Sequence, residues 1–357
     1  MPNWSDLLQE INQLGSPFDI LRRKYISELK AYTCRNVIAY YSGFLQKPEL
    51  KANNAVNDQD KNGLMTAVNG LDVALGLDLI LHTPGGDTAA TESIVDYLWQ
   101  KFGSNIRCFV PQMAMSAGTM IACACKEIWM GKQSSLGPVD PQFNGIPAHG
   151  VLEEFRRAHD QIVTDPRTIP LWQPIVAKYP PAFLGECEKA IKWSTELVSS
   201  WLARNMLQED PQKEDTISKI LTEIVDHSVS YAHNRHLSAQ KCESIGLKIR
   251  HLEEDQELQE KVLSLHHIYF HTLSATPAFK IIENHNGKAF ILQAQHMLIQ
   301  QPAQQMKNIP VMDIPSLPQL KEEPAQPVAA PDRYAPGELT VGHDKIDFVL
   351  FIHGQQL

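Results

Sequence analysis

Two short stretches of small residues, HTPGGDTA (82–89) and PQMAMSAGTMIA (111–122), contain residue types suited to acyl transfer. In each stretch an apolar run ends, small residues follow, and a helical pattern begins. The first backbone N–H groups of a helix lack partners and favour negative charge. Ser116 stands at the second corner, where Ala117 and Gly118 leave its hydroxyl sterically open. A serine next to such amides combines a nucleophile with an oxyanion hole.

The adjacent glycines Gly85 and Gly86 could present backbone amides to the same point. Without a Cβ, a glycine lets another group approach its backbone closely. The same small residues also suit simple helix–strand packing, and Ser116 also suits a helix N-cap, so the pattern alone leaves both interpretations open.

The order of the segments predicts an α/β core. Strands alternate with helices, which favours parallel pairing with right-handed crossovers. Ser5 to Leu29 has a helical apolar pattern, and the polar stretch from Gln46 to Asn62 is expected to be a loop. Asp87 or Thr88 suits a helix N-cap. The expected strands are 35–45, 77–84, 105–111 and 126–131, and the expected helices are 63–71, 88–103 and 116–125.

The pattern becomes predominantly helical from about Val151. A short helix capped by Ser238 and stopped by Gly246 is expected next, followed by a hairpin over 279–292 with an Asn-Gly turn. Beyond residue 292 the chain is rich in proline and glutamine, which is typical of a flexible, disordered tail, although its last residues look strand-like. We therefore divide the chain into an N-terminal helical segment (1–30), a main domain (31–292) and the tail (293–357).

The composition excludes several functional classes. The 357 residues carry 32 Lys and Arg against 41 Asp and Glu, a net charge of −9 that argues against a nucleic-acid partner. No signal peptide or membrane-spanning run of roughly 18 apolar residues is recognisable, so a cytoplasmic protein is expected.

No metal or cofactor site is predicted. Cys123 and Cys125 form a Cys-x-Cys pair without a second pair, which favours buried free thiols. Asp58 and Asp60 in NDQDKNG resemble part of a calcium loop, but the bidentate glutamate is missing, so a solvated loop is expected.

Five blocks of the sequence together resemble the serine dehydrogenase proteinase family: RNVIAYYS, LDLILHTPGG, MAMSAGTMIA, EIWMGKQSSLGPVDPQ and ENHNG. This family is a branch of the group that holds the Clp protease proteolytic subunit, signal peptide peptidase A and crotonase. The resemblance covers about Ser27 to Leu292 and implies a spiral of β-β-α turns that assembles into homo-oligomers. It also implies Ser116 as nucleophile and the amides of Gly86 and Ala117 as oxyanion hole, with Gly85 and Gly118 in the substrate site.

The general base departs from the Clp pattern, which places a histidine where this chain has Asp140 and an aspartate where it has Asn234. The departure suggests exchanged roles, in which a histidine accepts the Ser116 proton and Asp140 orients it. Strand parity favours His236, whereas the resemblance favours His233. His149 is a spare candidate, and a Ser–Lys dyad with Lys126 or Lys132 is the other option.

We therefore expect a serine peptidase that acts on peptides or proteins without a cofactor. Three alternatives stay open: a crotonase-type acyl-CoA enzyme, a catalytically inactive relative that binds peptides or partners, and a role at a membrane surface. His82, just before the glycines, is expected to pack beneath the oxyanion loop.

Overall fold

The computed structural model describes residues 18–143, 145–225, 235–295 and 347–353, to which every structural statement below refers. A mixed sheet with the strand order β10-β5-β3-β2-β1-β11-β12-β13 forms the centre of the fold. Its first five strands run parallel, and β11 is antiparallel to both β1 and β12. The strands are β1 (Asn36–Ser42), β2 (Leu77–His82), β3 (Ile106–Val110), β5 (Glu127–Met130), β10 (Ile249–His251), β11 (Ala278–Asn284), β12 (Ala289–Gln295) and β13 (Asp347–His353).

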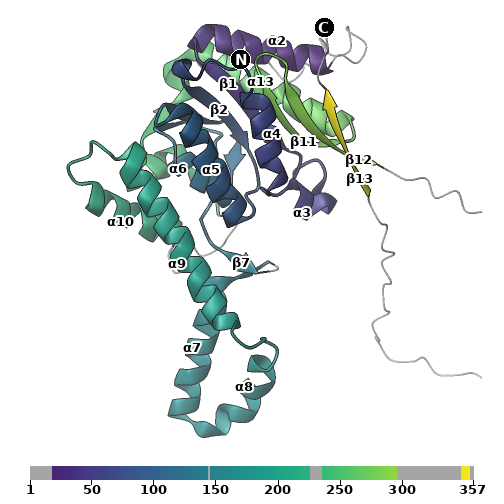
Figure 1. Cartoon of the computed structure of the whole chain (residues 1–357). Helices are drawn as coiled ribbons and strands as arrows, with labels where there is room; N and C mark the ends of the chain where they lie inside the picture. The colour runs from purple at the N-terminus through teal and green to yellow at the C-terminus, as the bar shows by residue number, and fades with distance from the viewer. Residues whose placement is uncertain (1–17, 144, 226–234, 296–346, 354–357) are drawn as a thin grey trace, which may run out of the picture. The chain divides into compact units, whose positions relative to one another are not determined.

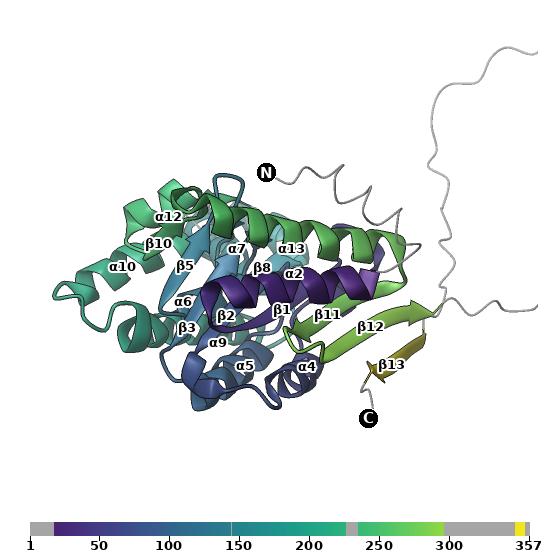
Figure 2. The ribbon, with the colours of Figure 1, turned by 90° about the horizontal axis from the view of Figure 1, so that it is seen from above.

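Helices cover both faces of this sheet (Figures 1 and 2). Helices α2 (Phe18–Thr33) and α13 (Gln256–Ala275) lie side by side on one face, and α4 (Gln59–Val68) and α5 (Thr88–Phe102) lie on the other. Both faces of the central strands are therefore buried, which explains why β1 and β2 are fully buried along their length. One core cluster joins α2 and α13 to the sheet and includes Tyr41, Phe109 and Tyr269.

Local signals in the sequence correctly indicated several element boundaries. The Asp87 carboxylate accepts a hydrogen bond from the Ala90 amide at the start of α5 (2.8 Å). Ser238 caps α12 (Ala239–Ile245), and Gly246 ends that helix with φ +112°. The hairpin between β11 and β12 also forms as expected.

The expected loop over 46–62 is wrong. This stretch contains a short 3-10 turn (Pro48–Leu50), α3 (Lys51–Asn54) and the first turn of α4. Its polar composition misled the prediction, because Asn54 and Asp60 are buried polar residues with hydrogen-bonding partners. Of the expected helix over 5–29, the described part begins at Phe18, and most of the tail lies outside the described residues.

A second, small sheet joins three segments that are distant in sequence. Its strands are β4 (Met113–Ala114), β6 (Ser135–Leu136) and β9 (Leu237–Ser238). β6 pairs with β4 in parallel and with β9 in antiparallel fashion. The segment just before Ser116, the segment leading to Asp140 and the segment following His236 are therefore neighbours.

The helical region predicted from Val151 onwards starts as an arm that extends away from the sheet and ends beside the helices of the main body (Figure 1). It consists of α7 (Ala148–Thr164), α8 (Ile169–Val176), α9 (Phe183–Trp201) and α10 (Lys213–Ile224), and α7 packs against α9. A separate apolar cluster of Ala148, Val151 and Cys187, with aromatic rings around it, holds α7 and α9 together. The remaining α-helix among the described residues is α6 (Ala117–Cys123), which directly follows Ser116.

Candidate active site

Ser116 occupies the corner between β4 and α6 in a conformation that non-glycine residues rarely adopt, with φ +50° and ψ −113°. Strained backbone of this kind costs on the order of 1–3 kcal/mol and clusters at functional sites. The side chain does not cap α6, and no described residue hydrogen-bonds to its hydroxyl. The N-cap interpretation of Ser116 therefore does not apply, and its half-buried hydroxyl is available to another molecule.

The glycine pair lies directly against this corner. A methyl group placed on Gly85, whose φ is +92°, would lie 2.7 Å from Ser116 Cβ and 2.9 Å from the Ala117 nitrogen. Such distances are too short for real Cβ contacts, so only glycine fits here. The loop after β2 and the corner before α6 thus pack backbone to backbone, as expected from the two small-residue stretches.

The backbone amides of Gly86 and Ala117 differ from those of their neighbours in their hydrogen bonds. Among the described residues, neither amide donates a hydrogen bond, although the neighbouring Gly85 and Gly118 amides both do. Buried backbone amides in folded proteins almost always have a partner, so the free amide of the buried Ala117 is unusual, and the free amide of the exposed Gly86 is open to an acceptor from outside the chain.

Buried hydrogen bonds fix the Ser116 corner to the segment that carries Asp140. The Thr119 hydroxyl lies 3.0 Å from the Ala114 carbonyl oxygen and 2.7 Å from that of Gly137, and the Gly137 amide donates back to it. A methyl group on Gly137 would collide with Met115, so these segments are in close contact. Asp140 follows three residues later and is buried.

The histidines predicted as general base differ in their surroundings. His236 is exposed, and its Nδ1 atom lies 2.8 Å from the Ser135 hydroxyl. Nδ1 is the ring nitrogen to which an orienting carboxylate would bind, so Ser135 occupies that position. His233 lies outside the described residues. His149 is half-buried at the start of α7.

The lysines weighed for a Ser–Lys dyad point to solvent. The side chains of Lys126 and Lys132 are exposed, and the Lys132 amide binds Glu253. No described contact connects either lysine with Ser116.

The solvated-loop expectation is wrong for Asp60, although Asp58 is exposed. Asp60 is fully buried on α4 and forms an ion pair with the equally buried Lys280 of β11, at 2.8 Å. Burial lowers the pKa of Lys280, and the Asp60 carboxylate opposes that shift. Sequence reasoning missed Lys280, and a lysine within the apolar run of a predicted strand was the available signal.

His82 is buried at the end of β2, directly before the loop that carries the glycines. Its ring lies among Tyr41, Phe44 and His266, with centroids 5.0–5.5 Å away. Burial lowers the pKa of His82 to about 3 and holds the pKa of His266 well below its usual value. Both imidazoles are therefore neutral in the folded protein at neutral pH.

This neutral pair makes the stability of the fold sensitive to acid. Below about pH 6.5 both histidines bind protons in the unfolded chain but not in the folded one, so stability falls as the pH decreases towards the folded-state values. We expect a loss of about 1.4 kcal/mol per pH unit from each histidine. Urea unfolding between pH 7.5 and 5 should show the slope, and His82→Phe should reduce it. An unchanged slope in His82→Phe would contradict this assignment.

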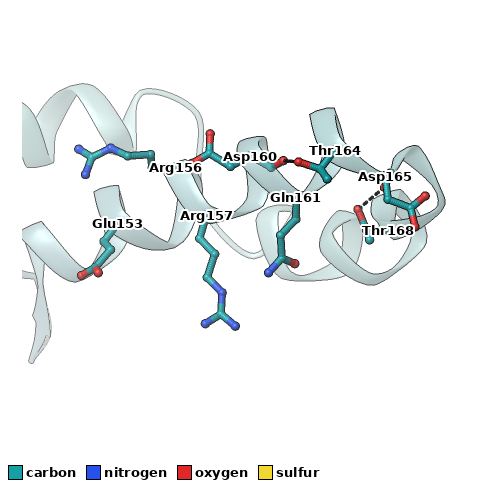
Figure 3. Close-up of a pocket in the computed structure, with 8 residues that line it drawn as sticks. All are labelled: Glu153, Arg156, Arg157, Asp160, Gln161, Thr164, Asp165 and Thr168. Carbon is teal, nitrogen blue, oxygen red and sulfur yellow. Dashed lines mark hydrogen bonds between the residues drawn. The ribbon is translucent and has the colours of Figure 1, made fainter.

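Other features of the described residues do not indicate a second active site. A pocket of about 570 Å³ on the helical region is lined by polar side chains, most of them exposed, including Arg156, Arg157 and Asp160 (Figure 3).

Five of the six cysteines are buried thiols, as predicted, and Cys34 is exposed. No group of three potential metal ligands occurs in the described ranges, and no helix there is long and apolar enough to cross a membrane.

Comparison with known proteins gives three findings. Residues 42–289 match the family model described as "ClpP-like SDH-type serine proteinase". The uncharacterized proteins MJ1495 and MJ0137 of Methanocaldococcus jannaschii are 29% and 30% identical, over 62% and 59% of this chain. The chain covers 66% and 64% of their lengths, slightly less than two thirds. A solved mutant of the 1510-N membrane-bound stomatin-specific protease aligns with 18% identity and a TM-score of 0.35, over 58% of this chain and 79% of its own.

Proposed function

We propose, on the premise that this chain belongs to the family of ClpP-like SDH-type serine proteinases, that it hydrolyses peptide bonds through an acyl-enzyme on Ser116. The observation that supports this best is the combination of an accessible Ser116 hydroxyl, at a corner with positive φ packed against Gly85, with two amides that donate no hydrogen bond within the described residues. The amides belong to Gly86 and Ala117, the residues expected to form the oxyanion hole.

The proposed reaction proceeds in two steps. The Ser116 oxygen attacks the peptide carbonyl while a histidine accepts the hydroxyl proton, and the Gly86 and Ala117 amides bind the resulting oxyanion. The intermediate collapses to the acyl-enzyme, and the amine leaves with the proton from the histidine. Water then attacks the acyl carbonyl by the same route, releases the acid and regenerates Ser116.

For the general base we propose His233, with His236 as the alternative and Asp140 as the group that orients the imidazole. The Nδ1 atom of His236 lies 2.8 Å from the Ser135 hydroxyl, which occupies the position that the proposal gives to the Asp140 carboxylate. The pairing of β9 with β6 brings the chain that follows both histidines next to the segment that leads to Asp140. His149 and the lysines are not part of the proposal.

The proposal further includes protein or peptide substrates, a cytoplasmic location and assembly into homo-oligomers. Sedimentation of the purified full chain measures the oligomeric state directly, and a monomer at micromolar concentration would contradict the last part.

The identity of the nucleophile is tested with a fluorophosphonate probe and peptide mass mapping. We expect one label per chain, on Ser116. No label on Ser116, together with calorimetric binding of an acyl-CoA, would contradict the peptidase proposal and favour the crotonase-type alternative. No label and no acyl-CoA binding would favour the inactive relative.

A further inference from the structure

A buried ion pair below the active-site loop is not used by the proposed reaction. Lys280 of β11 and Asp60 of α4 are each completely inaccessible to solvent, and their charged atoms lie 2.8 Å apart. The Tyr40 hydroxyl donates a third bond to the Asp60 carboxylate at 2.8 Å. Burying two charges carries a large desolvation penalty, and an apolar pair of similar volume often gives equal stability. The contacts of this pair with the backbone indicate a role besides stability.

Both partners hold the short segment between α3 and α4. The Lys280 ammonium donates to the Ala55 carbonyl at 2.7 Å. The Asp60 carboxylate accepts from the Asn57 amide at 2.9 Å. These two bonds hold the residues directly before and after Val56, so the ion pair fixes the position of Val56.

Val56 holds the active-site loop in the same manner. Its amide donates to the Gly85 carbonyl at 2.8 Å, and its carbonyl accepts from the Asp87 amide at 2.9 Å. These bonds hold the residues directly before and after Gly86. A methyl group on Gly86 would lie 2.3 Å from both the nitrogen and the oxygen of Val56, so the two backbones are in direct contact.

We propose that Lys280 and Asp60 are positioning residues that fix the direction of the Gly86 amide through Val56. The inference rests on the proposed function, in which that amide binds the oxyanion. An oxyanion hole works because its donors are held in place before the charge develops. The ion pair is linked to the backbone around Val56 by side-chain-to-backbone hydrogen bonds, and Val56 is linked to the backbone around Gly86 by backbone hydrogen bonds, so loss of the ion pair should loosen the Gly86 amide.

The test uses Lys280→Met, Asp60→Asn and the double variant in the full chain. Either single change leaves a buried charge or acceptor without its partner, which lowers both stability and turnover. In the double variant no unpaired charge remains, so its unfolding midpoint recovers, but the Ala55 carbonyl still lacks its donor. We expect kcat to fall about 10- to 100-fold in Lys280→Met and in the double variant, with KM within about threefold, since losing one oxyanion donor entirely costs about 10²–10³-fold.

A second buried ion pair provides the matched control. Arg22 and Glu283 are 2.8 Å apart, and the Tyr269 hydroxyl also donates to Glu283. Glu283 lies on β11 three residues from Lys280, so it faces α2 and α13 on the other side of the sheet. Arg22→Met together with Glu283→Gln removes a comparable pair and should leave kcat within about threefold at temperatures where the variant is folded.

Hydrogen exchange separates this inference from the proposed function. Peptides covering 83–89 should exchange faster in Lys280→Met and in the double variant than in the Arg22 control, whether or not the protein hydrolyses peptides. Unchanged exchange there, or a kcat that recovers together with stability in the double variant, would overturn the positioning role. A wild type that is never labelled at Ser116 while exchange responds as expected would contradict the proposed function instead.

Discussion

Ser116→Ala is expected to lower kcat by on the order of 10⁶-fold, the size of the loss when a catalytic serine is removed from a hydrolase that depends on it. The variant keeps the fold, because the Ser116 side chain has no described hydrogen bond and does not cap α6. Replacing it removes the attacking oxygen without leaving a buried polar group unpaired. Turnover of a p-nitrophenyl ester and of a peptide pool, with circular dichroism as a check on folding, measures the effect.

Ser134→Ala is the matched control for this change. The Ser134 hydroxyl is buried, accepts from the Gly131 amide at 2.9 Å and contacts the Pro111 carbonyl oxygen at 3.3 Å. Its loss lowers stability by about 1–3 kcal/mol, but turnover of the folded enzyme should stay within a few-fold of wild type. Activity that survives in Ser116→Ala would refute the nucleophile assignment.

His233→Ala gives the second-largest effect that we expect, a decrease in kcat of at least about 100-fold, the lower end for loss of a general base. A general base acts only in its unprotonated form, so wild-type kcat/KM should rise with pH as that base loses its proton. The variant should lose this limb of the profile. Measurements of kcat/KM between pH 5.5 and 8.5 test both statements.

His236→Ala serves as the comparison, since its Nδ1 atom is engaged by Ser135. It should lower kcat by less than about tenfold. If His236→Ala has the larger effect, His236 is the base. If neither change reduces turnover, the exchange of roles between histidine and aspartate is wrong.

The sequence predicted the α/β core correctly, because its signals are local and repeated, and the resemblance of five sequence blocks implied the ClpP/crotonase-like form of that core. Buried strands appeared as continuous apolar runs, and caps such as Asp87 and Ser238 marked the helix starts. The closeness of Gly85 to Ser116 was also predictable. Two loops that leave neighbouring parallel strands on the same sheet edge lie close together, and both stretches consist of small residues.

The buried ion pair of Asp60 and Lys280 could not be predicted from the sequence. Asp60 and Lys280 are 220 positions apart, and their pairing depends on how α4 packs against β11. A single acidic residue in a polar stretch gives no local sign of burial, so Asp60 looked solvated. The same limit applied to His236, whose bond to Ser135 follows from the pairing of β9 with β6. Strand parity alone does not reveal which neighbour occupies a ring nitrogen.

The central claim is that the Ser116 hydroxyl and the amides of Gly86 and Ala117 converge on one oxygen-sized position. A crystal structure of the fluorophosphonate-labelled enzyme tests this most directly, because the phosphonyl oxygen takes the place of the oxyanion. We predict that this oxygen lies about 2.7–3.1 Å from both nitrogens. A phosphonyl oxygen that points to solvent or binds other donors, with the two amides empty, would contradict the account.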